Sequence, residues 1–388
     1  MLSTSLLLLA ASQLQAPKVS VNLGSQASIN IQADRVGNYL YVDGVINGKR
    51  VRLVVDTGAG LNVLTWDAAK RIGIEGGSAT RAVGSGGADS RAKIVNIDEF
   101  NIGGVSVKND AAVIVDLPAQ LKADGLVGFS FFRHFATTFD YDSNQLIVND
   151  SKFFKPSGAL TSTELLVVNN HPHVGGVLDG VKGLLLLDTG NNGSATIYKW
   201  FADQQDLAKK WKTGAPKVAG KGVGGFSSGR ATVAPSFQLG AVTTVPSILT
   251  IDGDEKGIFA DRKVCANVGA EHLRRFKFTL DYPGKKAYFE RANAYSEPQR
   301  LDRSGMRVDY VNGQQVVIDV QEGSPASRVG VRVGDVLTHI NGRPTADLHP
   351  ISVLAAFQAA PGTQIEVTLL AKGHSKTLKL TLEDLAIK

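Results

Sequence analysis

An Asp-Thr-Gly tripeptide stands at the end of an apolar run twice in this chain. The first copy ends the run in RLVVDTG with Asp56, and the second ends the run in LLLLDTG with Asp188. A given tripeptide is expected only about 0.1 times in a chain of ordinary composition and this length, so chance does not account for both copies. A carboxylate beside buried strand residues is costly unless another group compensates it. The repeated pattern therefore predicts that the two aspartates act together.

The segments after each Asp-Thr-Gly resemble one another, which indicates an internal duplication. Each contains a glycine-rich stretch and then a Val-Gly pair whose glycine precedes an Asp-Tyr aspartate by 12 residues. Short β-like runs separated by glycine turns fill both segments, and Asn47-Gly48 between two such runs is typical of a tight hairpin. The sequence therefore predicts a mainly β protein with two related lobes, at 20–155 and 156–292.

The C-terminal part of the chain differs in character and predicts a third unit at 300–388. A polar, proline-containing linker at 292–300 precedes it. The segment 323–342, GSPASRVGVRVGDVLTHING, ends in Asn-Gly, which is a turn signal. A helix is expected at 349–358. This pattern favours a small domain that contains both strands and helices.

The two aspartates predict an acid–base pair. A pseudo-twofold arrangement of the lobes would bring Asp56 and Asp188, which are 132 residues apart, face to face. Two close carboxylates do not both ionise at low cost, so the pair holds one proton between them. One member then accepts a proton from a bridging water that attacks a peptide carbonyl, and the other donates a proton to the carbonyl oxygen. This chemistry needs no metal ion and no cofactor.

The residues beside the aspartates suit the same chemistry. Gly58 and Gly190 let backbone N–H groups approach a carboxylate, and Thr57 and Thr189 carry hydroxyl groups that can hydrogen-bond between the two loops. The alternative is that both tripeptides are turns left over from the duplication, with Asp and Gly chosen for turn geometry. That alternative explains the repeat, but it does not explain why Asp and Thr stand together at the strand end in each lobe.

These motifs resemble those of the pepsin and retropepsin superfamily of aspartic proteases in its bilobal, single-chain form. The resemblance rests on Asp56-Thr57-Gly58, on Asp188-Thr189-Gly190 and on the hydrophobic-hydrophobic-glycine element Leu126-Val127-Gly128. It extends to bacterial aspartyl protease family proteins that carry a C-terminal PDZ domain. The family implies a β-barrel lobe on each side of a cleft that binds a protein or peptide substrate. It also implies flaps over that cleft, at Gly84, Ser85, Gly86, Gly224 and Gly225.

The second motif departs from the family pattern at two positions. Asn191 follows the second Asp-Thr-Gly, and Asn267 takes the first hydrophobic position of Asn267-Val268-Gly269. These asparagines favour the alternative function, a peptide-binding or scaffolding protein with a degenerate protease fold. Ala59 follows the first Asp-Thr-Gly and has no hydroxyl group to stabilise an ionised pair. We therefore expect a pH optimum less acidic than that of pepsin, at about pH 4–6.5.

The C-terminal unit resembles a bacterial PDZ domain through the segment 323–342. The resemblance implies that Ser304, Gly305, Met306 and Arg307 form the loop whose backbone N–H groups hold the carboxylate of a peptide C-terminus. In that mode the peptide adds as a further strand beside the one that follows the loop, and the helix expected further on forms the other wall of the groove. Peptide C-termini are therefore the expected partners of this unit. The alternative is a purely structural role in which the unit covers the protease.

Composition argues against several other functions. The net charge is +6 and no dense run of lysine and arginine is present, so nucleic acid is not an expected partner. The single cysteine, Cys265, has no cysteine to pair with. His171 and His173 have no carboxylate or cysteine close by in the sequence, so we interpret them as part of a polar loop and not as metal ligands. One chain supplies both aspartates, so the site does not require a dimer.

The N-terminus indicates export. We interpret residues 1–16 as a signal peptide, because small residues follow the apolar run Leu6–Ala11 and because Leu14-Gln15-Ala16 is similar to a cleavage site. The run is too short to cross a bilayer, so no stable membrane span is expected. The expected location of the mature protein is the periplasm or the outside of the cell.

Overall fold

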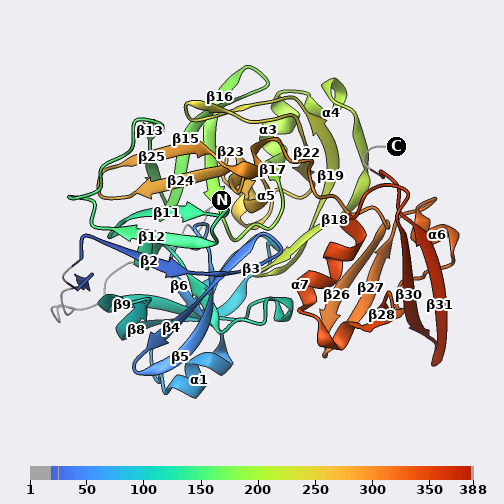
Figure 1. The fold of residues 1–388 in the computed structure, drawn as a ribbon, viewed down its shortest axis with the longest axis horizontal. Coiled ribbons are helices and arrows are strands. Elements are labelled where there is room, and N and C mark those ends of the chain that lie inside the picture. The colour runs from blue at the N-terminus through green and yellow to red at the C-terminus, as the bar shows by residue number, and fades with distance from the viewer. Residues whose placement is uncertain (1–18, 25, 386–388) are drawn as a thin grey trace.

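The strands form four sheets in the part of the chain that the structure describes. The structure is a computed structural model, and it describes residues 19–24 and 26–385. The predicted signal peptide at 1–16 therefore lies outside the described residues. The sheets comprise two large ones, a smaller one that joins them and a separate C-terminal one (Figure 1). The mainly β class that the sequence predicts is confirmed.

The first large sheet is built from the N-terminal third of the chain. Its strand order is β1-β9-β6-β10-β5-β4-β8-β7, and β3 pairs with β4. In addition, β8 pairs with β9, although the two strands are not neighbours in this order. The predicted hairpin turn at Asn47-Gly48 is confirmed, because both residues have positive φ and join β4 to β5. The strands are β1 (Ser20–Asn22), β3 (Asp34–Val36), β4 (Tyr39–Ile46), β5 (Lys49–Val55), β6 (Asn62–Leu64), β7 (Ser78–Ala82), β8 (Ser90–Ile102), β9 (Val105–Val115) and β10 (Gly125–Val127).

The second large sheet repeats this plan with later strands. Its order is β18-β19-β22-β17-β23-β16-β15-β20-β21, and β14 pairs with β15. The pairing of β16 with β23 is parallel, as is the pairing of β5 with β10 in the first sheet. The strands are β14 (Leu166–Val168), β15 (His171–Leu178), β16 (Val181–Asp188), β17 (Ala195–Ile197), β18 (Thr213–Gly222), β19 (Gly225–Ala234), β20 (Gln238–Leu239), β21 (Val242–Thr243), β22 (Ser247–Asp252) and β23 (Val264–Gly269).

A sheet of order β13-β25-β24-β11-β12-β2 takes strands from both halves of the duplication. Its central pair is antiparallel, with Ala136 of β11 opposite Asp281 of β24. Because one sheet serves both lobes, the boundaries expected at 155 and 292 stay a prediction. The strands are β2 (Ser28–Gln32), β11 (Ala136–Asp140), β12 (Gln145–Asn149), β13 (Thr161–Glu164), β24 (Phe276–Asp281) and β25 (Lys286–Arg291).

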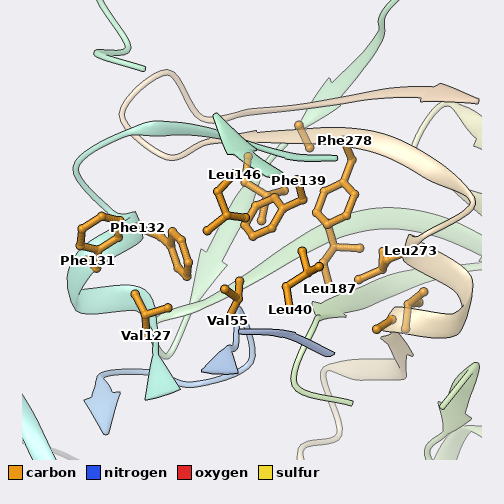
Figure 2. Packing of buried hydrophobic residues seen from close by; sticks show 14 of the residues in the cluster. Leu40, Val55, Val127, Phe131, Phe132, Phe139, Leu146, Leu187, Leu273 and Phe278 are labelled. Atoms are coloured by element: carbon orange, nitrogen blue, oxygen red, sulfur yellow. The ribbon is translucent and has the colours of Figure 1, made fainter. Parts of the chain in front are cut away.

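One hydrophobic core runs through both lobes beneath the joining sheet. Figure 2 shows Leu40 and Val55 from the first lobe and Leu187 and Leu273 from the second lobe below the rings of the joining sheet. In that layer the rings of Phe139 and Phe278 stack with centroids 4.7 Å apart. The lobes therefore share their interior and are not two separately packed bodies.

The helices are short and lie around the sheets. The first follows Thr65, whose Oγ1 accepts a hydrogen bond from the backbone N–H of Ala68, and ends at Gly73 in the left-handed region, as helix caps commonly do. No helix within residues 19–24 and 26–385 is long and apolar enough to cross a membrane. The helical elements up to residue 296 are α1 (Trp66–Ile72), η1 (Ala119–Leu121), α2 (Phe129–Phe132), α3 (Lys199–Gln204), α4 (Leu207–Lys210), η2 (Gly257–Ala260), α5 (Ala270–Leu273) and η3 (Asn293–Ser296).

The C-terminal unit has a sheet and a core of its own. The sheet order is β26-β27-β28-β30-β31, with β29 on β28, so β26 lies at an edge. Its core includes Val317, Val353 and Leu369. Figure 1 shows the unit beside the two lobes, with α7 and β18 near the junction. The elements are β26 (Met306–Val311), β27 (Gln314–Val320), α6 (Pro325–Arg328), β28 (Val336–Ile340), β29 (Arg343–Pro344), η4 (Thr345–Asp347), α7 (Pro350–Val353), η5 (Leu354–Gln358), β30 (Gln364–Ala371) and β31 (His374–Thr381).

Candidate active site

The two predicted aspartates lie at equivalent places, at the end of the second strand of the β4–β5 and β15–β16 hairpins. Asp56 comes directly after β5, and its backbone N–H donates to the carbonyl oxygen of Val127 in β10, 3.0 Å away. Asp188 ends β16, opposite Gly269 of β23. Buried apolar strands on both sides hold these two turns in place. The rigid position of each carboxyl group therefore comes from two parallel strands.

The two threonines lock the turns to each other with four hydrogen bonds. The backbone N–H of Thr57 donates to Thr189 Oγ1 at 3.0 Å, and the backbone N–H of Thr189 donates to Thr57 Oγ1 at 3.1 Å. Each hydroxyl group in turn donates across the interface, to the carbonyl oxygens of Leu187 at 2.7 Å and Val55 at 2.8 Å. Both threonines are fully buried. This reciprocal arrangement fixes the distance and orientation of the two loops.

The two glycines let the carboxyl groups approach. A β-carbon on Gly58 would overlap the carboxyl group of Asp188, and a β-carbon on Gly190 would overlap that of Asp56. Each carboxyl group thus packs against the backbone of the opposite loop. The structure brings together all six residues of the two tripeptides, in one site between the lobes.

The two carboxyl groups titrate as a pair. Burial raises the pKa of Asp56 well above its usual range, and the nearby charge of Asp188 and the hydrogen bond between the two side chains raise it further. Burial also raises the pKa of Asp188, but a hydrogen bond from Asn267 and the charge of His171 act in the opposite direction. Two close carboxyl groups in these conditions retain a proton to a higher pH than an isolated aspartate does.

The surroundings of the two aspartates differ. Asp188 Oδ1 accepts hydrogen bonds from the backbone N–H groups of Gly190 at 2.9 Å and Asn191 at 3.1 Å. Asp188 Oδ2 accepts one from Asn267 Nδ2 at 2.6 Å. Asp56 Oδ1, in contrast, is buried without a hydrogen-bond partner. Backbone N–H groups of Gly58 and Ala59 also stabilise the charge of Asp56, but only Asp188 has a side-chain amide donor as well.

Two neighbours of the pair were not predicted as site residues. Tyr39 begins β4 and His171 begins β15, so they hold the same place in the two halves of the duplication. Burial raises the pKa of Tyr39, as do the charges of Tyr41 and both aspartates, whereas burial lowers the pKa of His171 against the charge of Asp188. The interpretation of His171 as a polar loop residue is wrong, because it lies in a strand. The matching strand starts of the repeat were the signal that could have identified both.

The predicted flap residues of the two lobes meet. The backbone N–H of Gly86 donates to the carbonyl oxygen of Val223 at 3.0 Å, and that of Ala88 donates to the carbonyl oxygen of Gly224 at 3.3 Å. A β-carbon on Gly86 would overlap the backbone of Gly225. These contacts join the turn at 84–88, between β7 and β8, to the turn between β18 and β19.

The joined turns share an apolar cluster with the loop of Asp56. Ser85 lies against Gly222, the last residue of β18 before the other turn. The side chains of Val223 and Ala59 both pack against the apolar cluster that includes Leu126. Ala59 belongs to the loop of Asp56, so the flap turn and this loop border the same cluster.

The predicted carboxylate-binding loop of the C-terminal unit already holds a carboxylate. The backbone N–H groups of Ser304 and Gly305 donate to the two oxygens of Asp302, at 3.2 and 3.0 Å. The backbone N–H of Met306 donates to Ser304 Oγ at 3.1 Å. Arg307 points away from the loop and donates to backbone carbonyls of β18. These four residues thus lie at the edge strand β26, but their donors are engaged within the chain.

Metal ligation has no support in the described part of the chain. No group of three or more histidine, cysteine, aspartate and glutamate side chains there is arranged to hold a metal ion. His173, the partner of His171 in the sequence, is buried and its Nδ1 lies 2.9 Å from the carbonyl oxygen of His171.

Comparison with protein families agrees with the geometry. Residues 42–131 match the model of the aspartyl protease family, and residues 316–370 match that of the PDZ domain. Residues 42–131 are therefore part of an aspartyl protease-like domain, and residues 316–370 are part of a PDZ domain. The protease match contains Asp56 and the element Leu126-Val127-Gly128, whereas Asp188 follows it in the duplicated half.

Two known proteins show partial similarity to this chain. A protein of Rhizobium meliloti (strain 1021), described as a probable periplasmic serine endoprotease of DegP-like type, is 37% identical over 67 residues. That stretch is 17% of this chain and 13% of the relative, so the chain spans only a small part of the relative's length. The crystal structure of a retropepsin-like aspartic protease from Rickettsia conorii matches with 24% identity and a TM-score of 0.27, covering 34% of this chain and 93% of that chain.

Proposed function

We propose that this protein is an aspartic endopeptidase that hydrolyses peptide bonds with a water held between Asp56 and Asp188. The observation that carries the proposal is the pair of Asp-Thr-Gly loops joined by reciprocal threonine hydrogen bonds. The carboxyl group of half-buried Asp56 lies against that of buried Asp188, and burial raises the pKa of both, which supports one proton shared by the pair. The aspartyl protease match over residues 42–131 supports the same chemistry.

The pair can carry every proton that the reaction moves. The ionised carboxylate takes a proton from water as the water oxygen bonds to the peptide carbonyl carbon, and the protonated carboxyl group gives its proton to the carbonyl oxygen. The carboxyl group formed from the base then protonates the amide nitrogen as the C–N bond breaks. The other carboxylate regains a proton from a hydroxyl of the tetrahedral intermediate. The products are a carboxylic acid and an amine, and the pair returns to its starting state.

Three further assignments belong to this proposal. The turns at Gly84–Gly86 and Gly224–Gly225 serve as flaps over the cleft. The PDZ domain binds peptide C-termini or regulates the protease. Export is supported by the expected signal peptide at 1–16 and by the relative described as periplasmic.

The test is a digest of a peptide library by the protein from pH 3 to pH 8, beside Asp56→Asn and Asp188→Asn. We expect cleavage by the wild type alone, with an optimum at about pH 4–6.5, because activity needs one proton on the pair. Circular dichroism of the variants controls for folding. Cleavage that survives either substitution contradicts the proposal. A folded wild type that binds peptides without cleaving them supports the alternative of a degenerate, peptide-binding protease fold.

A further inference from the structure

Asn267 takes a position in the second lobe that has no polar counterpart in the first. It lies in β23 opposite Leu186, two residues before Asp188. The matching position in β10 is Leu126, opposite Val54. Asn267 is 1% exposed, and a buried amide of this kind is costly unless it is hydrogen-bonded. Because the two lobes are duplicates, comparison with Leu126 shows which contacts are due to Asn267.

A chain of hydrogen bonds fixes which end of the Asn267 amide faces the pair. The backbone N–H of Gly193 donates to Asn191 Oδ1 at 2.9 Å, and Asn191 Nδ2 donates to Asn267 Oδ1 at 2.9 Å. The Asn267 oxygen is thereby engaged, and its Nδ2 is left to donate to Asp188 Oδ2 at 2.6 Å. Both asparagines that depart from the family pattern thus belong to one relay that ends on a catalytic carboxyl group.

A donor on a carboxylate stabilises its ionised form. Asp188 accepts three hydrogen bonds, one of them from a side chain. Asp56 is stabilised only by the backbone N–H groups of Gly58 and Ala59, and its Oδ1 has no partner. The leucine at the matching position in the first lobe has no donor to offer. The cost of placing a negative charge is therefore lower on Asp188 than on Asp56.

We infer that Asn267 is a positioning residue that keeps Asp188 ionised as the base and places the shared proton on Asp56. This inference rests on the proposed aspartic protease function, and it assigns a different role to each member of the pair. Asn191 acts one step further back, by orienting the amide of Asn267.

The kinetic test is Asn267→Leu, which copies the first lobe, with Asn149→Leu in the joining sheet as a control. We expect kcat to fall about 10-fold or more, and the acid limb of kcat/KM to move up by about one pH unit, because one unit is the shift that a lost charge-assisted hydrogen bond of ordinary strength produces. In the double variant Asn267→Leu with Leu126→Asn, the amide donor moves from Asp188 to Asp56. We therefore expect the acid limb of kcat/KM to return toward its wild-type pH. A uniform loss of rate at every pH overturns the inference, because it is what a merely structural role would give.

A second measurement needs no activity. In Asp56→Asn the coupling is removed, so Asp188 titrates alone and can be followed by carbon-13 NMR of labelled aspartate. We expect its pKa to be higher in Asp56→Asn with Asn267→Leu than in Asp56→Asn. An unchanged pKa overturns the role of Asn267 even if the protein cleaves peptides. If the Asp188 pKa rises but the wild type does not cleave peptides, Asn267 keeps its role in the ionisation of Asp188 and the proposed protease function is rejected.

A second inference comes from the contact between the PDZ domain and the flap of the second lobe. Arg307 of β26 donates from Nη1 to the carbonyl oxygen of Val218 at 2.9 Å and from Nη2 to that of Ala219 at 3.1 Å. Lys221 Nζ lies 2.6 Å from Asp309 Oδ2, and the Asp309 side chain is only 5% exposed. Both acceptor carbonyls and Lys221 belong to β18, the strand that leads to the flap turn.

The first lobe occupies the space next to the same edge of the PDZ domain. The element η1 contacts both β26 and α7, which are the two walls of the expected peptide groove. Lys122 Nζ lies 4.5 Å from the ring centroid of Tyr310, and the ring of His349 packs edge-on to that of Tyr41. Ile351 of α7 is buried in the apolar cluster that Val223 of the flap also contacts.

We propose that the PDZ domain is an intramolecular clamp, whose partner is the β18–β19 flap together with η1 of its own chain. The clamp holds β18 by its backbone carbonyls and holds the first lobe by α7, so it restrains the flap turn that meets Gly86. Asp302 fills the carboxylate loop in this state. A peptide that adds to β26 must displace these contacts and thereby frees the flap.

The test uses the full chain with Arg307→Ala or Lys221→Ala. The first removes the hydrogen bonds from the PDZ domain to β18, and the second removes the ion pair from β18 to Asp309 of the PDZ domain. Arg343→Ala, an exposed arginine elsewhere in the PDZ domain, is the control. We expect amide hydrogen exchange in 217–224 to rise about 10-fold or more, because each substitution removes a charge-assisted contact, and kcat/KM for a short peptide to rise with it. Exchange equal to that of the control in both variants overturns the clamp, whether or not the protein has protease activity. Faster hydrogen exchange together with slower peptide cleavage would contradict the proposal that the clamp inhibits the protease.

Discussion

At the scale of single residues, glycine is required beside each aspartate for a steric reason. Gly58 and Gly190 have no left-handed backbone angle, so conformational freedom does not explain them. Each lies where a β-carbon would overlap the carboxyl group of the opposite lobe. The glycine of each tripeptide therefore serves the aspartate of the other one.

We predict that Gly190→Ala lowers kcat/KM by about 100-fold, since displacing a reacting group by about 1 Å has an effect of that size. The added methyl group pushes the Asp56 carboxyl group away from its partner. Gly175→Ala in the neighbouring strand β15 is a matched control, because a β-carbon there meets no atom within 4 Å. Steady-state kinetics at the optimum pH are the measurement. Equal kinetics for the two variants would show that the pair tolerates the displacement.

The threonines show how the buried backbone groups between the two loops are satisfied. Each hydroxyl group both accepts and donates, so neither loop leaves a buried donor without an acceptor at the interface. A satisfied network of this kind is rigid, because no member can move without breaking two hydrogen bonds.

At the scale of elements, the joining sheet decides how the lobes are held. Its pair β11–β24 places Phe139 opposite Phe278, and their rings stack with an interplanar angle of 10°. Neighbouring aromatic contacts continue this layer on both sides, to Phe132 and to Phe289. The apolar layer therefore crosses from one lobe to the other without a break.

We predict that Phe278→Ala lowers the free energy of unfolding by about 3–5 kcal/mol, the range for deletion of a buried aromatic ring. The residue is fully buried in the core that both lobes share. Urea unfolding followed by tryptophan fluorescence measures the change. Phe153→Ala, at a ring that is 65% exposed, is expected to change the same quantity by less than about 0.5 kcal/mol. A small effect at Phe278 would mean that the lobes are stabilised separately.

At the scale of the whole molecule, the duplication made much of the architecture predictable. The two Asp-Thr-Gly strands, the Asn47-Gly48 turn and a C-terminal unit of strands and short helices follow from local patterns and from their repetition. The pairing of the two tripeptides could be anticipated because twofold arrangements bring equivalent loops together. The family resemblance pointed to the two glycine-rich stretches as flaps, but the contact between their turns was not predicted.

Other features left no local signal. The joining sheet pairs residues such as Thr137 and Leu280, which are far apart in the sequence, and no periodicity in either segment specifies a partner. The contact of Arg307 with β18 depends on how two packed units dock. Asn267 stood out only as a departure from a family pattern, and its role became clear from the hydrogen bond to Asp188.

The joining sheet also constrains how a ribosome can make this protein. Strand β11 is synthesised about 140 residues before β24, which at ~5–20 residues per second is a delay on the order of 10 s. Through that delay the edge of β11 that β24 will cover stays open, and an open strand edge is a surface for wrong pairing. During synthesis the first lobe therefore has an unpaired strand edge that can pair wrongly with other chains until β24 covers it.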